Sequence, residues 1–172
     1  MTDTIQKVST NRIVFYSQIQ MAEVGKLRAL LLEMEEAEDP PAVIYLHLFS
    51  YGGDAYAGIC GYDIISNCSI PVHTFVEGFV CSAGTCLSIA GTKRYMSKNA
   101  SFMIHNCSST YAGSFQDMKV DLSNIQVLND RLVKMYKKVT QKKTGEIMQM
   151  MKDDCNLTAK ECQQYGFIHI IQ

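Results

Sequence analysis

Short apolar runs alternate with segments of helical periodicity in the first half of the chain. Three of these runs are rich in β-branched and aromatic residues, which favours strands: Ile13–Tyr16, Val43–Phe49 and Val72–Val76. Between them, Met21–Glu36 and Ala55–Ile65 predict helices, and the first helix carries one apolar stripe of Val24, Leu27, Leu31 and Met34. Strands that alternate with helices indicate βαβ units, so we predict an α/β fold. The run Val43–Phe49 is almost wholly apolar, which predicts a strand covered on both faces of a parallel sheet.

The segment after residue 90 predicts two short strands and one long helix. The strands are expected at Arg94–Met96 and Phe102–His105, followed by a polar loop over residues 106–113. Ser114–Asp117 resembles a helix capping box. Apolar residues then recur at four- and three-residue steps, at Met118, Leu122, Ile125, Leu128, Leu132, Met135 and Val139. A stripe of this length can serve as a contact surface for a partner.

The C-terminal part of the chain predicts short elements. Gly145 is expected to break the long helix before a short helix over Glu146–Lys152. Thr158–Glu161 resembles a second capping box, and its helix is expected to end at Tyr165–Gly166. Phe167–Ile171 then closes the chain as a strand.

Composition narrows the class of protein. The 172 residues fit one domain, and 47% hydrophobic with 19% charged residues is typical of a globular chain. The 16 basic and 17 acidic side chains leave a net charge of -1, so no global field attracts a polyanion, and we expect no nucleic acid partner. The chain has no signal-like N-terminus and no apolar stretch of about 18 residues, which predicts a cytoplasmic protein without a membrane partner.

Cysteine and histidine spacing gives no sign of a metal centre. The 7 cysteines form no C-x-x-C pair, and the 4 histidines show no zinc-like spacing with them. We therefore expect free, packed thiols, and no metal or cofactor in this chain.

A serine at a predicted strand-to-helix turn is the first candidate for chemistry. Ser82 lies in GFVCSAGTCLSIAG, with Gly78 four positions before it and Gly84 two positions after it. This arrangement resembles a nucleophile elbow, in which the hydroxyl is lifted off the sheet and the first helical amides face a developing oxyanion. Small residues at such a turn serve close helix packing equally well.

A second strand-to-helix corner contains Gly52 and Gly53. It follows the strand Val43–Phe49 and precedes the helix Ala55–Ile65. Glycines at such a corner allow the backbone amides to be exposed, so the corner can bind an anion or an oxyanion.

A serine hydroxyl needs a base, and histidine has a suitable pKa of about 6.5. His105 is the best placed histidine because it ends an apolar strand, whereas the other three lie within strands. A base in turn needs a carboxylate that orients the imidazole. Asp153 and Asp154 precede the capped C-terminal helix, where a solvated helix terminus is the alternative interpretation, and spacing alone does not choose between them.

Four segments together resemble the proteolytic subunit of the Clp protease family. HLFSYGGDAYAG is similar to the family segment I-N-S-P-G-G-x-x-x-x-G, and GFVCSAGTCLSIAG is similar to the nucleophile helix G-M-A-A-S-M-G. FMIHN resembles M-I-H-Q-P, and DDCNLTAKECQQYGFIHII resembles D-R-D-x-x-[ML]-[ST]-A-x-E-A-x-x-Y-G-[LI]-[IV]-D. The matches keep their order over residues 11–171.

The resemblance implies a serine endopeptidase with a Ser-His-Asp triad. Ser82 matches the family nucleophile and His105 matches the general base. Counting back from Tyr165–Gly166 through the family motif favours Asp154 over Asp153 as the orienting acid.

The resemblance also assigns backbone groups. Gly53 and Ala83 match the positions whose N–H groups form the oxyanion hole. Gly52 and Gly53 would bind an extended polypeptide substrate along the glycine corner, because backbone pairing accepts many side chains.

The implied fold is a crotonase-like (ClpP/crotonase) βαβ spiral over residues 1–172, with a projecting handle helix region at about residues 114–143. The implied assembly is a homo-oligomer of two stacked seven-membered rings, a tetradecamer that encloses the active sites. The implied partner is an AAA+ unfoldase of the Clp type, which would use ATP to feed polypeptide substrates into the chamber.

The chain departs from the family pattern at several points. Tyr51 replaces the proline before the glycine pair, and Asn106–Cys107 replaces Gln-Pro after the histidine. The chain starts close to its first strand and ends at Gln172, so we expect trimmed versions of the pore-lining N-terminal segment and of the C-terminal tail.

Three other functions stay open at this point. The short N-terminus is compatible with a ClpP-like relative that matures viral capsids without an unfoldase. An acyl-CoA hydratase or isomerase of the crotonase superfamily would use a similar pair of amides without a serine nucleophile. A noncatalytic ring subunit would scaffold an active paralogue. The presence of Ser82, His105 and Asp154 argues against the last two.

Overall fold

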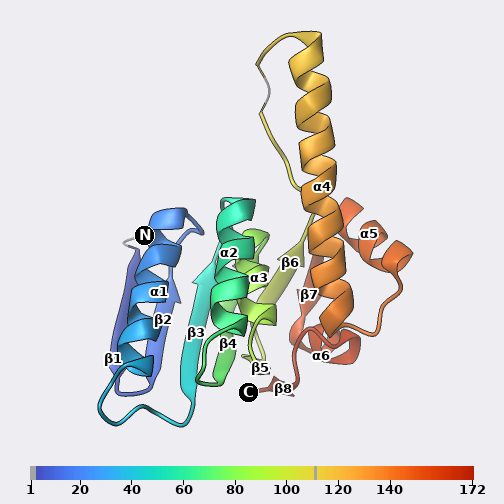
Figure 1. Ribbon diagram of the computed structural model, residues 1–172. Coiled ribbons are helices and arrows are strands. Elements are labelled where there is room, and N and C mark those ends of the chain that lie inside the picture. Colours follow the sequence, from blue (N-terminus) through green and yellow to red (C-terminus); the bar gives the residue numbers. More distant parts are fainter. Residues whose placement is uncertain (1–2, 111) are drawn as a thin grey trace.

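The computed structural model describes residues 3–110 and 112–172, which form a mixed sheet with helices against one face and at one end (Figure 1). The strands of this part of the chain are β1 (Thr4–Ser9), β2 (Arg12–Tyr16), β3 (Ile44–Ser50), β4 (Val72–Cys81), β5 (Lys93–Met96), β6 (Ser101–Ile104), β7 (Cys155–Thr158) and β8 (Ile170–Ile171). Its helices are α1 (Met21–Glu35), α2 (Ala55–Ser66), α3 (Ala83–Ile89), α4 (Phe115–Val139), α5 (Thr144–Lys152) and α6 (Ala159–Tyr165).

The sheet has the parallel centre that the alternation of strands and helices predicts. Strands β2, β3, β4, β5 and β8 run parallel in that order, and β1 pairs antiparallel with β2 at one edge. Strand β6 leaves this order, since it pairs parallel with β4 and antiparallel with β7. The predicted α/β class with βαβ units is confirmed.

Strand β4 is longer than predicted because it serves two neighbours. Its first half pairs with β5, and Phe79–Cys81 pairs with β6. Gly78 lies between the halves with φ +72°, and the register against β3 shifts nearby. The sequence-based end of this strand before Gly78 is therefore wrong, because the glycine forms an irregularity in the strand rather than its end.

The core lies between the sheet and α1, α2 and α3, which stand in front of it in Figure 1. The buried residues of α1 are those of the predicted stripe, namely Val24, Leu27, Leu31 and Met34. The prediction that β3 is covered on both faces is wrong: Ile44, Leu46 and Leu48 are buried, whereas Tyr45, His47 and Phe49 are half-buried. Aromatic neighbours shield this second face, and His47 stacks on Phe75 with ring centroids 4.7 Å apart.

The long predicted helix is α4, and its outer half projects away from the sheet (Figure 1). Ser114 and Asp117 form the predicted capping box. Leu128, Leu132, Val133 and Tyr136 are the buried residues of the inner half. In the outer half, Phe115 is 71% exposed and Leu122 is 69% exposed, so the apolar pattern continues onto the surface of the protomer. No helix within residues 3–110 and 112–172 is both long enough and apolar enough to cross a membrane.

Two predicted boundaries in the C-terminal part are wrong. Gly145 lies inside α5, because α4 already ends at Thr140, whose extended backbone stops the helix and whose hydroxyl donates to the Tyr136 carbonyl. The final strand is limited to Ile170–Ile171, because Ile168 N–H still donates to the carbonyl of Cys162 beyond the end of α6. The predicted cap at Thr158 and the end of α6 at Gly166, with φ +91°, are confirmed.

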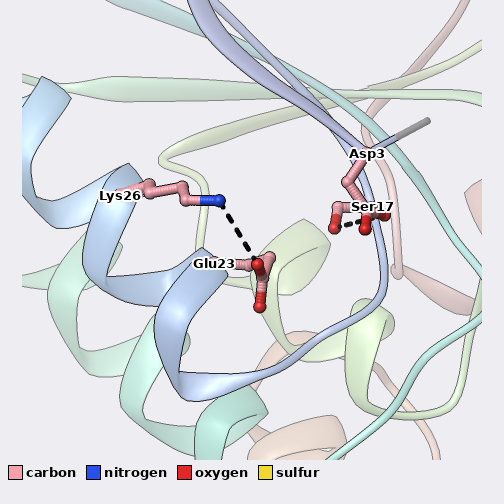
Figure 2. Close-up of polar contacts among 4 residues, drawn as sticks. All are labelled: Asp3, Ser17, Glu23 and Lys26. Carbon is pink, nitrogen blue, oxygen red and sulfur yellow. Dashed lines mark hydrogen bonds and ion pairs between the residues drawn. The ribbon is translucent and has the colours of Figure 1, made fainter.

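Polar contacts fasten the N-terminal edge of the sheet. Figure 2 shows the hydroxyl of Ser17 donating to the carboxylate of Asp3 over 2.9 Å, while the backbone N–H of Ser17 donates to the carbonyl of Phe49. In the first turn of α1, Glu23 lies 3.4 Å from the ammonium group of Lys26, and its charge also favours the helix N-terminus.

A buried arginine joins the last segment of the chain to β5. Arg94 is 9% exposed and donates to the carbonyl oxygens of Phe167 and Gly166 over 2.8 and 3.1 Å. Its side chain therefore satisfies backbone acceptors that no regular secondary structure reaches.

We expect Arg94→Met to lower the free energy of unfolding by about 3 kcal/mol, because it leaves these buried carbonyl groups unpaired. Urea denaturation followed by circular dichroism, at equal protein concentrations, measures the change. The exposed neighbour provides the control, since Lys93→Met is expected to change the value by less than about 0.5 kcal/mol. Equal stability of the two variants would contradict the role given to Arg94.

Candidate active site

The glycine corner after β3 is built for close backbone contact. Gly52 has φ +91° and Gly53 has φ +149°, and a Cβ atom on Gly53 would lie 2.3 Å from the carbonyl oxygen of Ile19. The neighbouring bridge uses the carbonyl of Gly52 and the N–H of Asp54 as partners of Ile19. The N–H of Gly53 lies between them and is not used by this bridge.

Ser82 occupies the turn between β4 and α3. Its backbone has φ +53° and ψ -127°, a conformation that L-residues rarely adopt. Its N–H donates to the carbonyl of Met103 over 2.9 Å, which attaches the turn to β6. The corner and the turn are in contact, because a Cβ atom on Gly52 would lie 2.7 Å from the Cβ of Ser82. The strand-to-helix turn predicted at Ser82 is present.

Pairing through β6 brings the other two candidates to the same edge of the sheet. Cys81 lies opposite Met103 on parallel strands, and Ile104 lies opposite Cys155 on antiparallel strands. Ser82 and His105 each follow the last residue of their strand, and Asp154 immediately precedes β7. Continuing the antiparallel register by one residue places His105 opposite Asp154.

The structure separates the two adjacent aspartates. Asp153 caps the end of α5, and its carboxylate accepts from the side-chain amide of Gln149 over 2.8 and 2.9 Å. Asp154 has φ +48° and an exposed side chain. Its charge adds to burial in raising the pKa of the thiol of Cys81, the residue before Ser82.

Two of the three candidate catalytic residues have an unusual backbone conformation. Among the residues that the structure describes, Ser82 and Asp154 are the non-glycine residues with positive φ. Such conformations cost about 1–3 kcal/mol each and concentrate at functional sites. This observation is independent of any sequence motif.

A cavity of about 530 Å³ contains both Ser82 and His105 in its lining. Gly53 also lines it, and α4 contributes Asp121, Asn124, Ile125 and Leu128. A volume of this size is typical of a ligand site. The side chains of Ser82, His105 and Asp154 make no hydrogen bond with one another in the described chain, so the relay is not closed in the isolated protomer.

Cys107 belongs to the lining of this cavity. All seven cysteines are free thiols in this structure, and burial raises the pKa of the Cys107 thiol. Within residues 3–110 and 112–172, no cluster of three or more His, Cys, Asp or Glu side chains could hold a metal ion.

Sequence reasoning missed the polar side chains that hydrogen-bond to the Ser82 turn and to the segment after His105. The hydroxyl of Thr85 donates to the carbonyl of Ser82 over 2.6 Å and lies 2.7 Å from the hydroxyl of Tyr136. The side-chain oxygen of Asn129 accepts from the N–H of Cys107 over 2.8 Å. The available signal was a tyrosine four residues after Leu132 on the buried side of α4, although helical spacing alone does not identify its partner.

The fold and this site define a class of α/β protein with a strand-end serine and a histidine in one cavity. A solved structure has a similar fold: a mutant ClpP1 from Listeria monocytogenes has a TM-score of 0.85, with 95% of this chain and 91% of that chain covered at 23% identity. The predicted ClpP/crotonase-like fold is thereby confirmed. A family model described as Clp protease matches residues 1–172, and on this evidence the chain belongs to the Clp protease family.

Sequence relatives agree with this membership. The chain is 30% identical over 171 residues to the ATP-dependent Clp protease proteolytic subunit of Deinococcus radiodurans, covering 96% of this chain and 82% of the relative. The protein of the same name from Staurastrum punctulatum is 28% identical over 172 residues, covering 98% and 86%. Proteolytic subunit 1 from Prochlorococcus marinus is 28% identical over 171 residues, covering 98% and 88%. The resemblance in the sequence is confirmed, and the family supports a protease of the ClpP type.

We expect Gly52→Ala to lower kcat/KM for a short fluorogenic peptide by about 100-fold, because the added methyl group pushes against Ser82 and displacements of about 1 Å have this effect. The matched control is Gly25→Ala in α1, where a Cβ atom would have no neighbour within 4 Å. This control is expected to keep its activity and to gain a few tenths to about 1 kcal/mol of stability. If both alanine variants cleave the peptide at the same rate, Gly52 has no role in placing Ser82.

Proposed function

We propose that this protein is a serine endopeptidase of the Clp proteolytic-subunit type. The observation that carries the proposal is the positive-φ turn at Ser82, whose side chain shares one cavity with His105. Asp154 at the neighbouring strand end completes a Ser-His-Asp set in that chain order.

The proposed reaction has two halves. The Ser82 oxygen attacks the scissile carbonyl, while His105 accepts the hydroxyl proton and Asp154 stabilises the resulting imidazolium. His105 then gives this proton to the leaving amine, and an acyl-enzyme remains. Water, deprotonated by the same imidazole, attacks the acyl group and releases Ser82 with its proton restored.

Two backbone amides are proposed to bind the oxyanion. Ala83 is the first residue of α3, so its N–H has no partner within the helix. The N–H of Gly53 is not used by the bridge to Ile19 and belongs to a residue of the cavity lining. Donors fixed in this way stabilise a tetrahedral intermediate without reorganisation.

Closure of the relay is proposed to follow substrate binding or assembly. Catalytic hydrogen bonds are often long or absent in free enzymes and tighten in the complex. An extended polypeptide that pairs with the Gly52–Gly53 corner would cover the open side of the cavity and exclude water from His105.

The proposed assembly is a homo-oligomer of two stacked heptameric rings, located in the cytoplasm and served by an AAA+ unfoldase that uses ATP. The relatives' name, ATP-dependent Clp protease proteolytic subunit, supports an ATP-dependent partner. The projecting outer half of α4 supports self-association, because its exposed apolar side chains are unsuited to water.

Labelling with a fluorophosphonate probe tests the nucleophile. We expect intact-mass measurement to show one adduct per protomer on the wild-type protein and none on Ser82→Ala, because only an activated serine hydroxyl attacks the probe. Ser88 in α3 provides the control, since Ser88→Ala removes a buried hydroxyl of the same helix and is expected to leave labelling intact. An assembled wild-type protein that takes up no adduct would remove the peptidase assignment.

A charge on the handle tests the assembly. We expect Leu122→Glu to reduce the particle mass in light scattering and to reduce peptidase activity, because a carboxylate would be buried where two handles meet. Leu122 is a better site than Leu128 of the same stripe, which is 8% exposed and belongs to the protomer's own core. The control is Lys134→Glu on an exposed position of the inner half of α4. Unchanged mass and activity in Leu122→Glu would exclude the handle as the contact.

A further inference from the structure

Helix α4 is hydrogen-bonded to the segment that carries Ser82. The hydroxyl of Thr85 donates its single proton to the Ser82 carbonyl over 2.6 Å. The 2.7 Å contact between the hydroxyls of Thr85 and Tyr136 therefore has Tyr136 as the donor. The result is a chain of two hydrogen bonds from α4 through α3 to the carbonyl of Ser82.

This chain of hydrogen bonds is sealed from water. Tyr136 is 1% exposed and Thr85 is 0% exposed. The ring of Tyr136 is held edge-on against Phe167, with centroids 5.8 Å apart. Burial raises the pKa of Tyr136 well above its ordinary value, so its hydroxyl stays protonated and remains a donor. Linked hydrogen bonds in a low dielectric strengthen one another.

The recipient of these bonds is a strained residue. The carbonyl of Ser82 accepts from both the N–H and the hydroxyl of Thr85, while its own N–H is attached to Met103. A residue at φ +53° persists only when its surroundings determine its conformation strongly. The hydroxyls of Thr85 and Tyr136 help to hold Ser82 in this conformation.

A second bond connects α4 to the segment that carries His105. The side-chain oxygen of Asn129 accepts from the N–H of Cys107, two residues after His105. The family pattern has proline where this chain has Cys107, and proline has no N–H to donate. The departure from the pattern thus provides the donor for a contact with the helix.

We propose that Tyr136, Thr85 and Asn129 are positioning residues, through which helix α4 sets Ser82 and His105 in their catalytic alignment. The inference rests on the proposed peptidase function. It predicts that removing these polar groups slows the chemical step while substrate binding is retained, because none of the three is proposed to touch the reacting atoms.

Kinetics of single-group variants test the inference. We expect Tyr136→Phe and Thr85→Val each to lower kcat and the rate of fluorophosphonate labelling by about 10-fold, with KM within about twofold of the wild-type value. Thr85→Ser keeps the hydroxyl and is expected to restore both rates. The double variant is expected to be no slower than the slower single variant, because both changes break one chain of bonds.

Two further variants complete the comparison. Asn129→Leu is expected to lower kcat in the same way, whereas Asn129→Asp keeps an acceptor oxygen and is expected to retain most of the activity. Tyr62→Phe is the matched control for Tyr136→Phe, since it removes a phenol hydroxyl from a buried tyrosine of α2. Rates are compared per assembled protomer, after light scattering and circular dichroism have established equal folding.

The outcomes separate the inference from the proposed function. Wild-type protein that is labelled at Ser82, with Tyr136→Phe and Thr85→Val at wild-type kcat, would overturn the inference and leave the peptidase intact. The inference would also be overturned if these variants lost thermal stability but kept the wild-type kcat per folded protomer. If Tyr136→Phe does not fold, the comparison of Thr85→Val with Thr85→Ser decides. Absence of labelling in the wild type would instead refute the proposed function.

Discussion

The position of β6 between the end of β4 and β7 is the constraint on which the candidate site depends. Neighbouring strands lie about 4.8 Å apart, so three adjacent strands span about 10 Å. Residues that flank these strands at the same edge of the sheet therefore lie within about 10 Å of each other. The parallel register of β4 with β6 and the antiparallel register of β6 with β7 meet this condition for Ser82, His105 and Asp154. A shift of one residue in either register would turn one of these side chains to the opposite face.

Hydrogen bonds at the same edge of the sheet stabilise the strained backbone of Ser82. The unusual backbone at Ser82 is fixed by its N–H bond to Met103 and by the two bonds that its carbonyl accepts from Thr85. The glycine corner approaches so closely that a side chain on Gly52 would strike Ser82. The site is therefore formed by backbones of separate segments in direct contact, and the side chains that do the proposed chemistry extend from a rigid frame.

Much of this arrangement could be predicted from the sequence where periodicity and glycines report on local structure. The stripe of α1, the capping boxes at Ser114 and Thr158 and the strand-end place of Ser82 are of this kind. Edge strands β1 and β7 gave no signal, because both are short and mix apolar with exposed polar residues. The sequence motif favoured Asp154 over Asp153, but only the structure shows that the Asp153 carboxylate is engaged by Gln149.

Contacts across long sequence separations escaped prediction for a different reason. Thr85 and Tyr136 are 51 positions apart, and neither departs from the pattern of its own helix. Arg94 similarly reads as part of a short strand, although its guanidinium group reaches carbonyls more than 70 positions away. Helical and strand periods describe one element at a time, so the partner of a buried polar group becomes visible only when the elements are placed together.

In the proposed function, the two halves of α4 link assembly to catalysis. An isolated helix of about a dozen residues is marginal in water, and Phe115, Met118 and Leu122 in the outer half of α4 are exposed in the protomer. Contact with another handle would bury side chains such as Phe115 and Leu122 and thereby order the whole helix. The inner half of the same helix carries Tyr136 and Asn129, which bond to the segments of Ser82 and His105. In the proposed peptidase, a protomer outside the proposed assembly would lack the contact that orders its positioning helix.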